Sequence, residues 1–276
     1  MQKPDKAFLE RIGAGHKVAG PRRRVPGVQG NPPEGDVLCC AGEPAPTSYR
    51  NELMRLVVVF ADSELAGAAG FCPFINRGPG VRERIIAAKI VTEKYVHAEM
   101  ALRLLEPFGV NAMLYVRSHA WESRLDRQID LGTRRIGGDK RLNVFHYPLE
   151  GWEDAIVFNM LMGEATSIQL AEMTRSSYSP LADAIAQILP REREHAQLGA
   201  SGVGQAILRS GTKTAVQAAV NYWHPRVAAT FGRVDSDHAA IYIQYGLRRR
   251  SSAEMLSDWK AQSTAALKRL GIAIPD

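Results

Sequence analysis

The sequence has few cysteines, and this scarcity bounds both the fold and the compartment. Only Cys39, Cys40 and Cys72 occur among 276 residues, too few and too irregularly spaced for a disulfide framework or a zinc ribbon. The adjacent pair Cys39 and Cys40 is interpreted as free thiols, although neighbouring thiols are able in principle to bind metal. We therefore expect a reducing, cytoplasmic compartment.

The sequence also lacks the segments that direct a chain to a membrane. Its first residues, MQKPDKAFLERIGAG, contain no apolar core of a signal peptide, and no stretch approaches the ~18 uninterrupted apolar residues of a membrane span. The net charge is also small: 35 basic and 29 acidic residues leave an excess of +6. That excess suits anionic partners such as nucleic acid, lipid headgroups or CoA thioesters, but it selects none of them.

Alternating strand patterns and βαβ rhythms are almost absent, and helical periodicity takes their place. Four long segments are apolar nearly all round, which is typical of helices at the centre of a bundle, and shorter helical segments follow. The sequence therefore predicts an all-α bundle. The predicted helices cover residues 47–71, 81–109, 151–175 and 181–208, and then 213–230, 237–249 and 252–270.

Composition divides the chain into three predicted parts. Residues 1–47 are rich in Gly and Pro after a short helix predicted at 6–12, and we interpret them as an irregular N-terminal arm. Residues 48–232 form the predicted bundle, and residues 233–276 are expected to be C-terminal helices that pack on it. The arginine run at 22–24 in the arm is either a solvated charge run or a contact to a ligand phosphate or a partner.

Ionisable residues inside the apolar helices are the most informative feature, because burying a charge without a partner is costly. The first and third long helices carry Glu64 and Glu164, and the second and fourth carry His97 and His195. Glu192 precedes His195 by three residues, which places both on one helical face. This arrangement is like half of a di-iron carboxylate design in a helix bundle. Imidazole and carboxylate groups suit Fe(II) or Mn(II).

One position departs from that design. Lys94 stands three residues before His97, where a second Glu-x-x-His pair would place its glutamate. A protonated lysine cannot bridge two metals, but it could form a salt bridge with Glu64, Glu164 or Glu192 and fill the site without metal.

Two other arrangements stay open at this position. Glu93 is offset by about 100° round the helix, so it could substitute only if the helix were distorted. A neutral Lys94 could itself be a ligand, since burial and a neighbouring metal both lower the pKa of a lysine. Lys94 is therefore the candidate catalytic residue.

At these residues the sequence resembles a known family. The segments SELAGAAGFCPFINRGPGVRERIIAAKIVTEKYVHAE, NVFHYPLEGWEDA, TRSSYSPLADA, EREHAQLG and AVNYWHPRVAATFG are similar, in order and spacing, to the catalytic subunit of the phenylacetyl-CoA epoxidase family, which belongs to the ferritin-like superfamily. The resemblance covers residues 48–232. It implies a ferritin-like four-helix bundle with additional C-terminal helices.

The resemblance also implies a chemistry. Members of that family are components of a bacterial monooxygenase of phenylacetate catabolism. Its di-iron site activates dioxygen and inserts one oxygen atom into the aromatic ring of an acyl-CoA, with electrons from a separate reductase. A structural subunit of the same family has lost its metal and stabilises its partner.

Most of the metal ligands that the resemblance implies are found at the matching positions of this sequence. Glu64, Glu192 and His195 match family ligands, and His97 matches the first histidine. Lys94 stands where the family has a ligand glutamate. The acidic residue of the third helix aligns with Gly163, so that the adjacent Glu164 is either a shifted ligand or a neighbour of the site.

Two functions follow from these observations. In the first, the chain is an oxygenase that oxidises an aromatic or acyl-CoA substrate in an apolar channel next to one or two irons, with dioxygen as co-substrate. The predicted metal ligands are Glu64, His97, Glu164, Glu192 and His195, with Glu64 and Glu192 as bridges, and the arginine clusters 22–24 and 248–250 suit CoA phosphates.

In the second, the chain is a metal-free structural or assembly subunit in which Lys94 neutralises the buried glutamates. Both functions predict a homo- or hetero-oligomer, the oxygenase with a reductase as its partner, and neither involves a membrane. A third interpretation, modification of nucleic acid, is disfavoured because the positive charge is too small and too dispersed.

Overall fold

The computed structural model describes residues 46–233 and 236–275, and this part of the chain is helical over most of its length and contains no strand. The prediction of an all-α fold is confirmed. The predictions for residues 1–45, which include the short helix at 6–12, the arginines at 22–24 and the pair Cys39 and Cys40, lie outside the described residues. The four long helices are α2 (Thr47–Phe71), α3 (Val81–Leu105), α5 (Trp152–Met173) and α6 (Ser179–Ser210).

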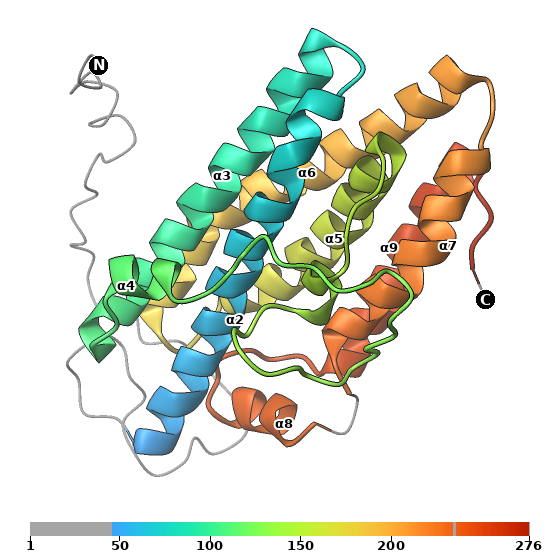
Figure 1. Cartoon of the computed structure of the whole chain (residues 1–276). Coiled ribbons are helices and arrows are strands. Elements are labelled where there is room, and N and C mark those ends of the chain that lie inside the picture. The colour runs from blue at the N-terminus through green and yellow to red at the C-terminus, as the bar shows by residue number, and fades with distance from the viewer. Residues whose placement is uncertain (1–45, 234–235, 276) are drawn as a thin grey trace, which may run out of the picture.

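The long helices form a bundle of two hairpins (Figure 1). Helix α2 packs mainly on α3, α5 packs mainly on α6, and contacts between α3 and α6 join the hairpins. Within each hairpin the connection is short, through η1 (Cys72–Arg77) in the first and residues 174–178 in the second. A single long crossover joins α3 to α5, as in ferritin-like bundles. It contains η2 (Glu106–Phe108), α4 (Ala112–Arg117) and η3 (Asn143–His146).

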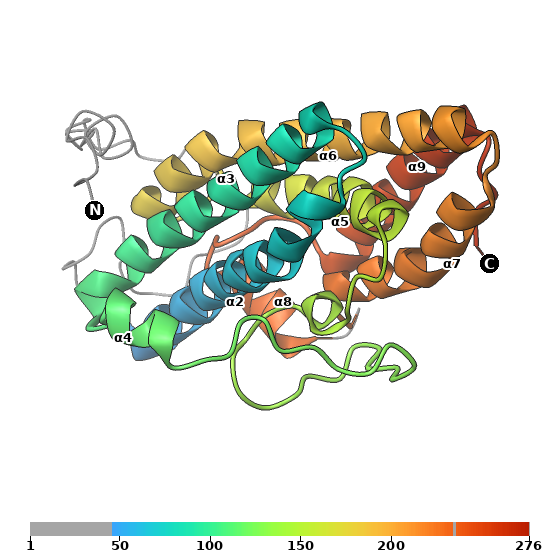
Figure 2. The same ribbon diagram turned by 45° about the horizontal axis from the view of Figure 1, so that its top comes forward.

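The crossover returns along α2 (Figure 2), where hydrogen bonds fix it beside the middle of that helix. Asp62 is fully buried. Its carboxylate accepts hydrogen bonds from the Tyr115 hydroxyl at 2.6 Å and from the backbone N–H of Lys140 at 2.5 Å. The next residue, Ser63, accepts a hydrogen bond from the backbone N–H of Leu142 at 3.0 Å. The crossover is therefore anchored directly before Glu64 on α2.

The C-terminal helices α7 (Thr214–Ala228), α8 (Asp237–Gln244) and α9 (Ser252–Leu270) follow, with η4 (Ala229–Phe231) between α7 and α8. Helix α9 packs on α5 and α7, and its buried Trp259 donates a hydrogen bond to the backbone carbonyl of Leu161 at 3.0 Å. Helix α8 ends at Gln244, before the predicted residue 249, because the chain turns at Gly246 with φ of 65°. Left-handed backbone of this kind ends helices and favours glycine.

Helix α2 and η1 together are long and apolar enough, by length and composition, to cross a membrane. Two thirds (67%) of the most apolar stretch is buried inside the protein. Apolar side chains on all sides are expected of a helix that contacts its neighbours and the crossover round its circumference. The apolar character of α2 is therefore explained by its place in the core.

Helices α5 and α6 approach each other closely at two glycines. A Cβ added to Gly199 of α6 would lie 2.5 Å from the backbone nitrogen of Met160, and one added to Gly163 of α5 would lie 2.9 Å from the Cα of Ala196. Both distances are too short for non-bonded atoms. At the same level, the side-chain amide of Asn159 donates a hydrogen bond to the backbone carbonyl of His195 at 2.7 Å. The glycines thus set the spacing of α6 from α5.

We predict that Gly199→Ala lowers the free energy of unfolding by about 1–3 kcal/mol, because the two backbones must separate. The matched control is Gly204→Ala in the same helix, where an added Cβ would lie 3.7 Å from its nearest neighbour, Leu270. There alanine should stabilise by up to about 1 kcal/mol through its helix propensity. Urea unfolding measures both variants, and equal stabilisation by both would contradict the close contact.

Candidate metal centre

Five of the predicted site residues come together in the middle of the bundle. Glu64 comes from α2, Lys94 and His97 from successive turns of α3, and Glu192 and His195 from successive turns of α6. Residues three apart share a helical face, so each pair points to the same side. All five are buried: Lys94 is 9% exposed and the other four are at most 3% exposed.

The two carboxylates of this group are bridged by cationic side chains. The Lys94 ammonium lies 3.3 Å from Glu64 Oε1 and 3.5 Å from Glu192 Oε1. The His97 Nδ1 lies 2.8 Å from Glu192 Oε1 and 3.4 Å from Glu64 Oε2. Each carboxylate therefore faces the same two nitrogen atoms. We call Glu64, Lys94, His97 and Glu192 the ion-pair cluster.

Within the ion-pair cluster, the neighbouring opposite charges favour the charged forms of Lys94, His97 and Glu192. Burial lowers the pKa of Lys94, but the charges of Glu192 and Glu64 outweigh it and the pKa is raised. Burial likewise opposes the charged form of His97, yet hydrogen bonds to Glu192 and Glu64 raise its pKa to about 9. Burial alone would raise the pKa of Glu192, and attraction to Lys94 holds it well below its usual value. Two cations thus balance two carboxylates.

His195 extends the cluster toward the surface. Its Nε2 lies 2.7 Å from Glu93 Oε2, and its Nδ1 lies 3.4 Å from Glu192 Oε1 without a hydrogen bond. The Glu93 side chain is 20% exposed and lies 3.9 Å from Arg191. Glu93 therefore joins the site from its edge, through His195, while α3 stays a regular helix and keeps Lys94 at the centre.

Helix α5 places a glycine, which has no side chain, at the position near the centre where a ligand would be needed. Gly163 packs against Ala196, next to His195, and has no room for a side chain. Glu164 forms no ion pair with the ion-pair cluster: the charge that acts on it is that of Arg269 of α9, and its buried Oε2 has no hydrogen-bond partner. Burial raises the pKa of Glu164 to about 7, although Arg269 lowers it. Among the described residues, α5 supplies no carboxylate to the centre.

These residues do not fit a two-iron centre. Such a centre in a ferritin-like bundle uses a glutamate from each of two helices and a Glu-x-x-His pair from each of the other two. Here Lys94 replaces one carboxylate and Gly163 leaves out another. Among the described residues one group could hold a single ion, since ligand atoms of Glu64, His97 and Glu192 lie within 4.8 Å of one another. The Lys94 ammonium contacts oxygens of the same two carboxylates.

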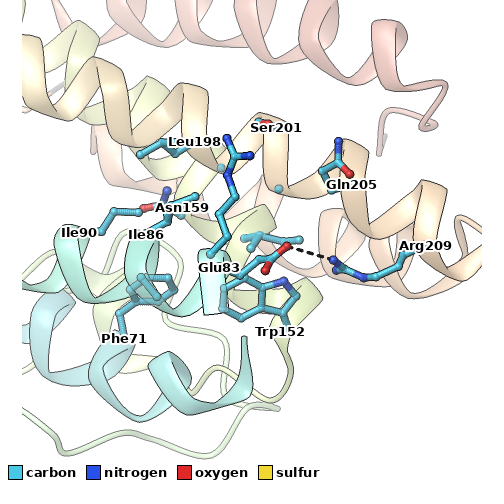
Figure 3. A pocket seen from close by; sticks show the side chains of 15 residues that line it. Phe71, Glu83, Ile86, Ile90, Trp152, Asn159, Leu198, Ser201, Gln205 and Arg209 are labelled. Atoms are coloured by element: carbon cyan, nitrogen blue, oxygen red, sulfur yellow. Dashed lines mark hydrogen bonds and ion pairs between the residues drawn. The ribbon is translucent and has the colours of Figure 1, made fainter. Parts of the chain in front are cut away.

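Two cavities flank the centre. The larger, of about 410 Å³, lies between α2, α5, the crossover and α8, and Glu64 forms part of its wall. The smaller, of about 270 Å³, lies between α3, α5 and α6 (Figure 3). The ion pair of Glu83 and Arg209, 3.3 Å apart, lies at this smaller cavity. Asn159, which donates to the backbone carbonyl of His195, also lines it.

Two contacts of this region were not predicted from the sequence. Asn159 is a polar residue in an apolar helix, and that contrast was the only available signal for its contact with His195. The pairing of Glu93 with His195 joins residues 102 positions apart, and periodicity cannot reveal it.

The raised pKa of His97 predicts a pH-dependent stability. Because the pKa of about 9 exceeds the unfolded value of 6.5, the stabilisation is complete below pH 6.5 and is lost as the pH rises through 9. A shift of this size corresponds to about 3 kcal/mol. Urea unfolding with chelator, between about pH 6 and pH 9.5, should show this loss in the wild type and a weaker one in His97→Gln. Identical pH profiles would contradict a protonated His97.

Comparisons with known proteins agree with the fold. The chain matches a family model described as phenylacetic acid catabolic protein over residues 39–276. It is 25% identical over 235 residues to one of the subunits of 1,2-phenylacetyl-CoA epoxidase from Escherichia coli (strain K12), across 84% of this chain and 71% of that protein.

A second relative is benzoyl-CoA oxygenase component B of Aromatoleum evansii, 22% identical over 237 residues. The match covers 77% of this chain, which spans about half (48%) of that protein's length. The resemblance inferred from the sequence is thus confirmed, and the ferritin-like fold with it. Because the family model covers most of its length, the chain belongs to the phenylacetic acid catabolic protein family.

Proposed function

We propose that this chain is a metal-free structural component of a multicomponent oxygenase, in which the ion-pair cluster takes the place of the iron centre. The observation that carries the proposal is the position of the Lys94 ammonium, 3.3 Å from Glu64 and 3.5 Å from Glu192. Its relatives are named as parts of an epoxidase and of an oxygenase. The chain would accordingly act together with a catalytic partner.

Charge supports this proposal. The carboxylates of an iron centre need a cation between them, because unpaired buried charges are strongly destabilising. Lys94 and a protonated His97 already supply two positive charges to Glu64 and Glu192. A divalent ion added there would face both cations, so it could bind only after protons leave or Lys94 moves. The cluster is therefore suited to hold three helices together, rather than to expose open coordination positions.

A second candidate function is the oxygenase itself, and the grouping of Glu64, His97 and Glu192 within 4.8 Å favours it. One iron held by these side chains, with His195 beside it, would supply dioxygen activation when bound. The substrate would be an aromatic compound or an acyl-CoA. Lys94 as catalytic residue and Glu164 as a ligand stay predictions that belong to this function.

The first test removes the cation from the cluster. Lys94→Met leaves Glu64 and Glu192 short of one positive charge, and we expect a loss of about 3–5 kcal/mol in the free energy of unfolding. The matched control is Lys89→Met on the same helix, because Lys89 pairs with Glu194 at the surface. Exposed pairs contribute about 1 kcal/mol or less. Urea unfolding in chelator decides: equal, small losses would contradict the structural role of Lys94.

The second test measures metal directly. After incubation with Fe(II) or Mn(II) and desalting, the wild type should retain fewer than about 0.3 ions per chain, because the ligands are held by protonated partners. Lys94→Glu should be less stable than the wild type without metal, and added metal should restore its melting temperature if the new carboxylate completes a site. Elemental analysis and thermal melting measure both effects. About one ion per wild-type chain, with a raised melting temperature, would overturn the metal-free proposal and favour the oxygenase.

A further inference from the structure

The smaller cavity, of about 270 Å³, is a recess that reaches the surface between α3 and α6 (Figure 3). The buried side chains of Ile90 and Ile156 line it from inside the bundle. Arg82 and Gln205 also line it, and both are exposed to solvent. No residue of the ion-pair cluster lines this cavity. It is therefore separate from the centre, and its shape and charge need an explanation of their own.

Three exposed apolar residues lie directly beside residues that line this cavity. Val81 and Ile85, one turn apart on α3, are 75% and 64% exposed, and Leu208 of α6 is 77% exposed. Val81 and Leu208 are the two most exposed large apolar side chains among the described residues. They belong to the same end of the helix pair, because Glu83 of α3 contacts Arg209, the residue after Leu208. Exposed apolar side chains that gather in this way mark interaction sites.

The same end of α3 carries positive charge that no neighbouring carboxylate balances. Arg77, Arg82 and Arg84 are all exposed, and no carboxylate of the described residues lies within 4.0 Å of their guanidinium groups. Glu83, the acidic residue among them, is already paired with Arg209. An exposed arginine is stable without a partner. The position of three such arginines beside an apolar surface and a recess is what points to a negatively charged ligand.

These observations together select the partner by its chemistry. A second copy of the same surface would bring like charges together, which opposes self-association through this face. A lipid bilayer would contact the exposed side chains but would leave the recess unfilled. A segment of another protein meets every condition, since a large apolar side chain fills the recess while acidic residues beside it pair with the arginines. Grooves between helices bind amphipathic segments in this manner.

We propose that the smaller cavity and the apolar, basic surface beside it bind a protein partner through an acidic segment that inserts one large apolar side chain. Apolar anchors buried in a pocket carry most of the binding energy of an interface. The surrounding charges set the orientation and the rate of association. The proposal holds whichever function the centre has, because it assigns a docking surface and uses no residue of the ion-pair cluster.

The first experiment identifies the partner in cells that naturally make the protein. The photoreactive residue p-benzoylphenylalanine replaces Ile85 in the full chain, and in a matched control it replaces Leu114 of α4, which is 65% exposed. We expect a cross-linked protein at position 85 alone, joined through a peptide that contains both acidic and large apolar residues. Mass spectrometry identifies that peptide. Absence of a protein product, a second copy of this chain, or a peptide rich in Lys and Arg would refute the proposal.

The second experiment measures the affinity of the purified full chain for the purified cross-linked protein. Arg82→Glu with Arg84→Glu should weaken binding by at least about tenfold, because the new carboxylates repel the acidic segment. The control, Arg103→Glu with Arg117→Glu, makes the same change in net charge at the other end of α3 and on α4. It should change the affinity by less than about twofold. Isothermal titration calorimetry measures both, and equal weakening would contradict a local role for the arginines.

A third variant tests the recess itself. Ser201 is exposed and lines the cavity, so Ser201→Phe should occupy space that the partner's side chain needs without disturbing the core. We expect binding weaker by at least about tenfold at an unchanged melting temperature. Unchanged affinity would overturn the proposal. So would binding to vesicles of phosphatidylcholine and phosphatidylglycerol that the double variant Arg82→Glu with Arg84→Glu abolishes, since that result assigns the surface to a membrane.

Discussion

The bundle depends on one electrostatic constraint: two glutamates lie in its core, and the core must supply the charge that balances them. Glu64 and Glu192 are almost completely buried, and in an apolar bundle each would strongly destabilise the fold if left alone. In di-iron proteins of this design, metal ions provide the compensation. Here Lys94 and His97 do so, from one face of α3. Helices α2, α3 and α6 are held in register because their charged side chains must meet.

Much of this arrangement follows from the sequence. The apolar periodicity predicts the four long helices, and the ionisable residues within them identify Glu64, Lys94, His97, Glu192 and His195 as neighbours. Such predictions succeed because a charged side chain in an apolar helix is costly to bury unless it lies beside a partner. The salt bridge of Lys94 with Glu64 and Glu192 was one of the alternatives that the sequence left open, and it is the one that the structure contains.

The features that could not be predicted depend on helix rotation and on long-range packing. Glu164 and Gly163 are adjacent in sequence, and only the rotation of α5 about its axis decides that Gly163 faces α6 while Glu164 is influenced by the charge of Arg269 on α9. The sequence does not predict that Arg135 and Arg248 line one cavity either, because one lies in the crossover and the other follows α8. The anchoring of the crossover at Asp62 places those segments against α2.

The glycine contact between α5 and α6 has a consequence for the carboxylates that this centre can accept. A carboxylate at position 163 would collide with the backbone of α6 at Ala196, so it could enter only together with a shift of one helix against the other. Replacing Lys94 by an acidic residue would therefore return one missing carboxylate, and the other would still be blocked. A two-metal site of the four-carboxylate kind would therefore need changes at position 94, at position 163 and in the spacing of α5 from α6. The close contact of two helix backbones thus limits how many carboxylates the centre can contain.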